Sequence, residues 1–168
     1  VLIIYYLMGN RVTKLCSCIF KKSIPKNITR KEVPKYIPEI TRGRVIDVYD
    51  GDTFTILGRV KNNPKLFQFQ IRLDGIDCPE KRTKNVIEKE ASIIAKKTVE
   101  HRVLNKIVYF KNVKLDKYGR LLTYVFYDKK KRSLNQELLD LRLAVKYDGG
   151  TKFVPTNWKK YMETGQLQ

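Results

Sequence analysis

Alternation of apolar and polar side chains predicts β-strands over much of the chain between Gly43 and Tyr127. The clearest case is the segment 67–73, in which Phe67, Phe69, Ile71 and Leu73 alternate with polar residues. A period of two is typical of a strand with one buried face. It places Arg72 on the face opposite the phenylalanines. Four further β-rich segments are expected at 45–49, 53–57, 107–115 and 120–127.

The chain after the predicted strand at 67–73 shows the spacing of a helix. The segment 87–104 is expected to form a helix, with one side that faces the core and carries Ile87, Ala91, Ile94 and Ala95. Ser133 and Gln136 match a capping box and predict the start of a second helix. Its inward side would be formed by Leu134, Leu138 and Leu141. A short C-terminal helix is expected around Trp158, Tyr161 and Met162.

The order of these elements is three strands, a helix, two strands and a helix. Five strands with segregated helices favour an α+β fold, in which a small closed β-barrel of the OB type has about three helices packed at its side. Barrels of this type commonly bind oligonucleotides on one face.

The first 40 residues differ from the rest of the chain. They open with an apolar run, Val1 to Met8, which is far short of the roughly 20 residues that span a bilayer. Basic residues and three prolines follow. We therefore expect residues 1–40 to form a flexible basic arm and residues 41–168 to form the folded domain.

The composition of the chain limits the classes of function and the kinds of active site that we expect. The chain carries 35 Lys and Arg residues against 17 acidic ones, a net charge of +18, which predicts attraction to nucleic acid or to an anionic membrane surface. Three cysteines do not make a disulfide framework, and the odd count favours a reducing compartment. With His101 as the single histidine, a His-dependent triad or a zinc site is not expected.

Three short segments combine residues suited to phosphodiester hydrolysis: 50–53, 72–80 and 116–120. The reaction needs a hard cation with oxygen ligands, positive donors for the transition-state charge and a carboxylate that handles the attacking water. Asp52 and Asp77 would bind the metal. Arg72 and Arg120 would bind the phosphate, and Glu80 would act on the water. Each segment alone could be a turn or a surface ion pair, and Asp50 and Asp74 fit such turn and surface roles.

The three segments together resemble the staphylococcal (micrococcal) nuclease family, also called thermonuclease-like. The family's Asp-Gly-Asp-Thr corresponds to residues 50–53, its Arg and Asp-Thr-Pro-Glu to Arg72 and residues 77–80, and its Asp-Lys-Tyr-Gly-Arg to residues 116–120. Its first helix opens with Glu-Ala-Ser, found here at 90–92, and its second helix supplies Asn135 and Leu138. The resemblance spans roughly Thr41 to Asp148, with Cys78 in place of the family's usual Thr.

This resemblance implies an OB-fold barrel with three helices and a Ca²⁺ ion held by Asp52, Asp77 and the backbone carbonyl of Cys78. It implies that Arg72, Glu80 and Arg120 are catalytic. Substrate contacts would come from Lys117, Tyr118 and Tyr147. The implied activity is a calcium-dependent endonuclease that cleaves DNA and RNA, with single strands preferred, and leaves 3′-phosphate ends. The alternative is a catalytically inactive OB-fold module that binds nucleic acid or protein.

The arm also contains a candidate lipidation signal. Residues 8–13 fit the pattern for N-myristoylation at Gly9, provided that translation starts at Met8. Cys16 and Cys18 could carry a second acyl chain, and the lysines that follow form a basic patch. These features predict a nuclease tethered to the cytoplasmic side of an anionic membrane, with no obligate protein partner.

Overall fold

A computed structural model describes residues 25–129 and 131–167. The chain divides into two units, Val1–Pro34 and Lys35–Gln168. In the first unit, the backbone N–H and the hydroxyl of Thr29 both donate to the carboxylate of Glu32, at 2.6 Å each. The predicted lipidation residues Gly9, Cys16 and Cys18 lie outside the described residues. Within the described ranges, no helix has the length and apolar character needed to cross a membrane.

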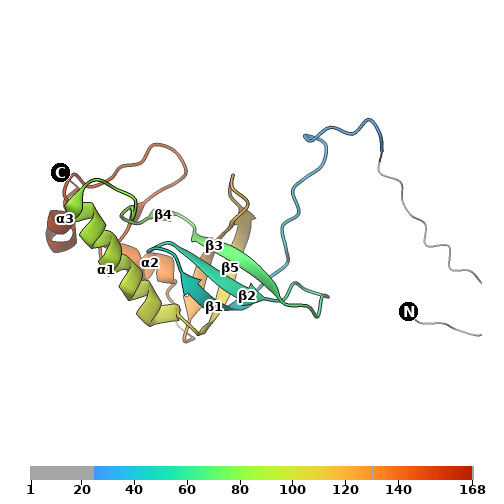
Figure 1. Ribbon diagram of the computed structural model, residues 1–168, viewed down its shortest axis with the longest axis horizontal. Helices are drawn as coiled ribbons and strands as arrows, with labels where there is room; N and C mark the ends of the chain where they lie inside the picture. The colour runs from blue at the N-terminus through green and yellow to red at the C-terminus, as the bar shows by residue number, and fades with distance from the viewer. Residues whose placement is uncertain (1–24, 130, 168) are drawn as a thin grey trace, which may run out of the picture. The chain divides into compact units, whose positions relative to one another are not determined.

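The second unit contains a closed barrel of five strands in the order β1-β2-β3-β6-β5 (Figure 1). The β3–β6 pair is parallel and the other pairs are antiparallel. This architecture, with three helices, confirms the predicted α+β fold of the OB type. The elements are β1 (Arg42–Val48), β2 (Thr53–Gly58), β3 (Phe67–Leu73), β4 (Ile76–Asp77), α1 (Val86–Val103), β5 (Ile107–Leu115), β6 (Leu121–Tyr127), α2 (Leu134–Asp140), β7 (Val145–Lys146) and α3 (Trp158–Thr164).

The barrel interior follows the predicted alternation in β6 but not in β3, where Phe67 is exposed, Phe69 is partly exposed, and Ile71, Arg72 and Leu73 are all buried. Along β6, every second side chain from Leu121 to Tyr127 is buried, and the intervening ones are partly exposed. The core also receives buried side chains from the other strands, among them Val45, Phe54, Ile56, Ile71 and Val108. Burial of these apolar groups is the main stabilising contribution to the fold.

The predicted inward face of α1 is partly wrong. Ala91 and Ala95 are buried as expected, but Ile87 and Ile94 are exposed, and the inward stripe continues through Val99 and Val103. Small residues lie on the inward side because the helix approaches the barrel closely. A Cβ atom added to Gly51 would come within 2.8 Å of the Ala95 Cβ.

The second and third helices form where the sequence places them. The Ser133 hydroxyl accepts a hydrogen bond from the Gln136 N–H at 3.2 Å, which caps α2. Leu134 and Leu138 are buried, whereas Leu141 is exposed because α2 ends at Asp140 and Leu141 is already its C-cap. Helix α3 packs beside the N-terminal half of α1 (Figure 1), where the buried Trp158 joins Ala91 in a small apolar cluster.

Candidate active site

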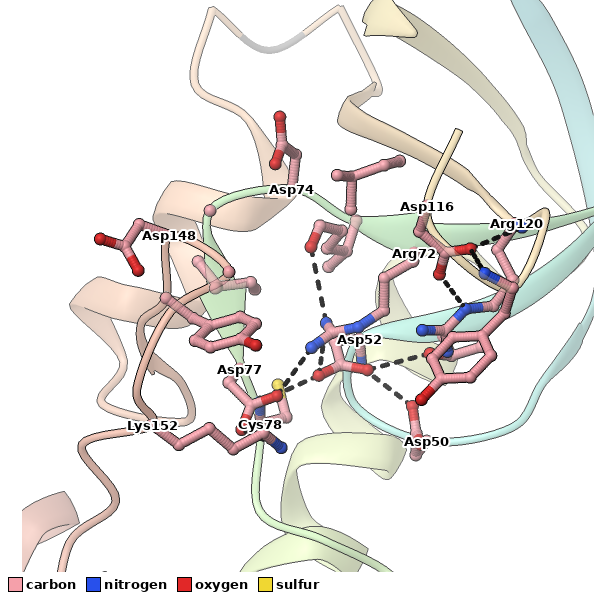
Figure 2. Close-up of a pocket in the computed structure, with 18 of the residues that line it drawn as sticks. Asp50, Asp52, Arg72, Asp74, Asp77, Cys78, Asp116, Arg120, Asp148 and Lys152 are labelled. Carbon is pink, nitrogen blue, oxygen red and sulfur yellow. Dashed lines mark hydrogen bonds and ion pairs between the residues drawn. The ribbon is translucent and has the colours of Figure 1, made fainter. Parts of the chain in front are cut away.

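One cavity of about 470 Å³ brings the three predicted segments together. Its volume is in the range of small-ligand sites, large enough for a nucleotide. All nine residues that the sequence predicted for metal, catalysis or substrate line it: Asp52, Arg72, Asp77, Cys78, Glu80, Lys117, Tyr118, Arg120 and Tyr147. Figure 2 shows this cavity with most of its lining side chains.

Asp52 is held by the tight turn between β1 and β2. Its backbone N–H donates to the Asp50 carboxylate at 3.2 Å, and the Tyr49 and Asp50 N–H groups donate to the Thr53 carbonyl at 2.9 and 3.2 Å. Gly51 has no room for a side chain, because a Cβ atom there would also lie 2.9 Å from the Cys78 sulfur. The turn therefore packs directly against the neighbouring segment and points the Asp52 carboxylate into the cavity.

Arg72 of β3 bridges the two candidate metal ligands (Figure 2). Its Nη1 lies 2.5 Å from Asp52 Oδ2 and its Nη2 lies 2.7 Å from Asp77 Oδ1. The register of the sheet fixes this position, because Arg72 pairs with Thr53 on β2 and with Leu122 on β6. The sequence predicted a phosphate contact for Arg72 but gave no sign that its guanidinium would first join the two carboxylates.

Asp77 reaches the site through the short β4–β7 ladder. Asp77 pairs with Val145 of β7. Tyr147, the first residue after β7, donates its N–H to the Gly75 carbonyl at 3.1 Å. The N–H of Cys78 donates to Asp52 Oδ2 at 3.0 Å, which ties together the two segments that carry the candidate metal ligands. This ladder also explains why Tyr147, from the far end of the sequence, lines the same cavity.

Asn135 of α2 anchors the turn that precedes Asp77. Its buried amide donates to the carbonyls of Asp74, at 2.8 Å, and Thr123, at 3.2 Å. Its oxygen accepts from the Val125 N–H at 3.0 Å. The side chain thus joins β6 to the β3–β4 turn. The family resemblance at Asn135 therefore reflects a structural role beneath the site.

Lys152 belongs to the site but was missed by the sequence analysis. Its ammonium lies 2.9 Å from Asp77 Oδ2, and Figure 2 shows these two residues. It also lies 2.9 Å from Glu80 Oε1. No local motif marks it, because it follows Asp77 by 75 positions and arrives on the loop between β7 and α3. The same cavity is lined by Asp50, Asp74 and Asp148, which also carried no predicted site role.

The third segment forms the opposite wall. Asp116 accepts from the N–H groups of Tyr118 and Arg120 at 2.8 and 2.9 Å, and from the Arg120 Nε at 2.6 Å. The exposed ring of Tyr118 lies between two cations, with Lys117 Nζ 5.0 Å and Arg120 Cζ 5.4 Å from its centroid. The two terminal nitrogens of Arg120 take no part in the bond to Asp116.

Electrostatics in the cavity favour a bound cation. Burial raises the pKa of Asp52 to about 6, because desolvation outweighs the attraction of Arg72, and burial likewise raises the pKa of Asp77 despite Lys152. The lining holds seven carboxylates and four cationic side chains, so its net charge is −3 when all of them are ionised. This excess of negative charge attracts cations.

The donor set fits a hard ion with oxygen ligands. Within residues 25–129 and 131–167, no three or more His, Cys, Asp or Glu side chains form a metal-binding group. A hard ion bound beside Asp52 and Asp77 would therefore find two carboxylates there and would need main-chain, water or substrate oxygens to complete its shell. Calcium accepts such mixed oxygen shells of six to eight ligands.

Comparison with known proteins agrees with this geometry. Residues 70–166 match the model of the family described as staphylococcal nuclease homologue. An uncharacterised endonuclease of Haemophilus influenzae is 35% identical over 109 residues, which cover 62% of this chain and 51% of that protein. An uncharacterised protein of Bacillus anthracis is 35% identical over 92 residues, or 52% of this chain and 40% of that protein. The chain thus spans about half the length, or less, of these curated relatives. The family match covers more than half of the chain, which therefore belongs to the staphylococcal nuclease homologue family.

Proposed function

We propose that this protein is a calcium-dependent endonuclease that hydrolyses phosphodiester bonds of DNA and RNA, prefers single strands and leaves 3′-phosphate ends. The observation that carries the proposal is the convergence in one cavity of two buried carboxylates, two arginines and the carboxylate of Glu80. The family match and the endonuclease name of one relative support a nuclease.

Asp52 and Asp77 would hold the calcium ion, with the main-chain carbonyl of Cys78 as a further ligand. When bound, the ion would neutralise charge on the scissile phosphate and so ease attack by an anionic nucleophile. Arg72 keeps the two carboxylates on one side of its guanidinium, at 2.5 and 2.7 Å, and thereby fixes their spacing before any ion arrives. Their burial excludes water that would otherwise weaken binding of the ion.

Arg72 and Arg120 would stabilise the charge that develops on the phosphate oxygens. A guanidinium has five N–H donors in a planar fork and can bind two oxygens at once. Arg120 uses only Nε for Asp116, which leaves its terminal amino groups for phosphate. Nη1 of Arg72 also donates to the Leu73 carbonyl at 3.5 Å, so Arg72 retains its Nε–H and the second N–H of Nη2 for phosphate.

Glu80 would orient the attacking water and accept its proton. The water oxygen would form a bond to phosphorus while the bond from phosphorus to the 5′ oxygen breaks, which leaves a 3′-phosphate on one fragment and a 5′-hydroxyl on the other. The leaving 5′ oxygen takes a proton from solvent. Glu80 is suited to this step because its carboxylate is accessible at the cavity mouth, next to Asp77 through Lys152.

Lys117, Tyr118 and Tyr147 would contact the substrate on either side of the scissile bond. Tyr118 presents an exposed ring on which a base can stack, and Lys117 adds positive charge beside it. The net charge of +18 would attract polyanions over longer distances and make binding dependent on salt.

Digestion of single-stranded DNA tests the proposal. We expect the wild-type chain to cut in Ca²⁺ and to stop in EGTA. Glu80→Gln should cut at least 100-fold more slowly, because an amide cannot accept the proton. Glu90→Gln is the matched control, since Glu90 is exposed on α1 and does not line the cavity; it should cut at the wild-type rate.

Cleavage products are analysed for their ends in the same experiment. A 3′-phosphate on each new end supports the proposed direction of attack. Binding of DNA without any cutting in Ca²⁺ would instead identify an inactive OB-fold module, and equal cutting in EGTA would refute the calcium mechanism.

A further inference from the structure

Lys152 makes two contacts in the cavity that no sequence motif predicts and that the proposed mechanism does not require. Its ammonium joins Asp77, a candidate metal ligand, to Glu80, the candidate base, at 2.9 Å each. Asp77 thereby has a cation on each oxygen, with Arg72 on Oδ1 and Lys152 on Oδ2. A calcium ion that coordinates the Asp77 carboxylate must share its oxygens with these two cations or displace one of them, and two positive charges so close to the ion oppose its binding.

The two cations differ in how easily they can leave. The side chain of Arg72 is 10% exposed and that of Lys152 is 40% exposed. Arg72 lies near the end of β3 and also binds Asp52, so its departure would leave two buried carboxylates without this partner. Lys152 can move into solvent with no such loss. A partly exposed lysine ion pair is also weak, because water screens it and the long side chain loses entropy when it is held.

The loop that carries Lys152 permits this movement. Its N-terminal end is fixed at Tyr147, which bonds Gly75, and its C-terminal end is fixed by the buried Pro155 and Trp158. Between them, residues 148–154 are exposed, and Gly149 has a φ of 96°, a conformation that favours glycine. The side chain of Lys152 can therefore swing away while both ends of the loop stay packed.

We propose that Lys152 is the counter-cation of the metal-free site: it neutralises Asp77 and Glu80 until calcium displaces it, and so it sets the calcium affinity of the pocket. The inference rests on the proposed function, because it assumes that Asp77 is a calcium ligand. Lys152 is not among the residues predicted from the sequence. In the metal-free protein it positions Glu80, and calcium must compete with its charge.

Isothermal titration of the full chain with CaCl₂, in the absence of substrate, tests the proposal. Lys152→Met removes the competing cation, and its Kd for calcium should be roughly tenfold lower than that of the wild type, the scale of one or two partly screened ion pairs. Lys152→Arg keeps the charge and should retain an affinity close to wild type. Lys152→Gln provides a second neutral variant and should behave like Lys152→Met.

Lys81→Met is the matched control for charge. Lys81 follows Glu80 directly, but its ammonium lies over the Tyr49 ring, 5.1 Å from the centroid, and it does not line the cavity. Loss of this charge should change the calcium Kd by less than about twofold. A similar gain in Lys81→Met and Lys152→Met would show a general charge effect and overturn the specific role of Lys152.

Thermal unfolding shows whether calcium displaces Lys152 or binds while Lys152 stays in place and merely repels it. In EGTA, Lys152→Met should melt below wild type, because Asp77 and Glu80 then lack their shared cation. In saturating calcium this gap should close, because the wild-type lysine has left its carboxylates as well. A gap of equal size in both conditions would mean that Lys152 stays in place beside the ion, which contradicts the proposal.

The outcomes also distinguish this inference from the proposed function. Folded wild-type protein that binds no calcium would overturn both. Wild-type protein that binds calcium and cuts DNA, together with a Lys152→Met variant of unchanged or weaker calcium affinity, would overturn only the role of Lys152.

Discussion

The cavity has a floor and a rim that are built differently. The floor consists of Asp52, Arg72 and Asp77, whose side chains are 8, 10 and 6% exposed and which lie on or beside barrel strands. The rim consists of side chains on loops, such as Glu80, which is 57% exposed, and Tyr118, at 72%. Floor charges are held by one another and by the fold. Rim side chains have water on one side.

Because of this difference, substitutions in the floor and in the rim should affect stability differently. A floor residue contributes to folding as well as to the reaction, because a buried charge that loses its partner destabilises the native state. A rim residue can be changed with little effect on stability, since exposed ion pairs contribute little. The comparison predicts a graded series of changes in the free energy of unfolding.

The largest change is expected for Arg72→Met. It leaves Asp52 and Asp77 buried without their shared cation, and the free energy of unfolding should fall by about 3 to 5 kcal/mol. Arg120 belongs to the rim, since it lies on the loop before β6 and its side chain is 26% exposed, and Arg120→Met should lower the free energy of unfolding by about 1 kcal/mol or less. Both variants should cut single-stranded DNA at least 100-fold more slowly. Urea unfolding and a cleavage assay check this, and equal stability of the two variants would erase the distinction between floor and rim.

The next prediction concerns how the free energy of unfolding depends on pH. Burial raises the pKa of Asp52 to about 6, against an ordinary value of about 3.9. An acid with a raised pKa binds its proton more tightly in the folded state, so its contribution to stability is present below about pH 4 and is lost as the pH rises through 6. A shift of about two units corresponds to about 3 kcal/mol.

Asp52→Asn isolates this contribution, because asparagine does not titrate. In EGTA, the stability of wild type relative to Asp52→Asn should fall by about 2 to 3 kcal/mol between pH 4 and pH 7. Urea unfolding of both proteins across this range measures the difference. A difference independent of pH would show that Asp52 is not held in the strongly desolvated state that defines the floor.

A smaller change is expected for Asn135→Ala beneath the floor. The substitution removes three hydrogen bonds that join α2, β6 and the β3–β4 turn, and stability should fall by about 2 kcal/mol. Gln136→Ala, at the adjacent exposed position, is the control and should change stability by less than about 0.5 kcal/mol. Equal effects of the two changes in urea unfolding would remove Asn135 from the support of the site.

The smallest change in stability is expected at the rim. Tyr118→Ala should leave the free energy of unfolding within about 0.5 kcal/mol of wild type. It should nevertheless weaken binding of a short single-stranded oligonucleotide by roughly fivefold or more, because a stacking ring is lost. Tyr36→Ala is matched in exposure, at 73% against 72%, and should not affect binding. Fluorescence anisotropy with EGTA present measures both, and equal binding by all three proteins would exclude a base contact at Tyr118.

Much of the fold could be predicted from local patterns. Strand β6 shows alternation that the barrel preserves, and the cap at Ser133 forms as predicted. The inward face of α1 could not be predicted in full, because apolar residues occur on both sides of that helix. The choice of Ala91 and Ala95 over Ile87 and Ile94 depends on how close the barrel lies, which only tertiary structure reveals.

The candidate site divides in the same way. The motif residues, from Asp52 to Arg120, could be predicted because each lies on a short segment with a recognisable chemical pattern, and the structure brings them into one cavity. Lys152 and the bridging geometry of Arg72 could not be predicted. Both arise from contacts between residues far apart in sequence, which depend on barrel closure and on the β4–β7 ladder.

Calcium binding and DNA cleavage, measured together on the same samples, test the central claim most directly. Titration of wild-type protein with calcium should give binding and cleavage curves with the same midpoint, and Asp77→Asn should lose both while circular dichroism shows it folded. Cleavage that persists in EGTA, or that is undiminished in folded Asp77→Asn, would contradict the assignment of the floor as the calcium site.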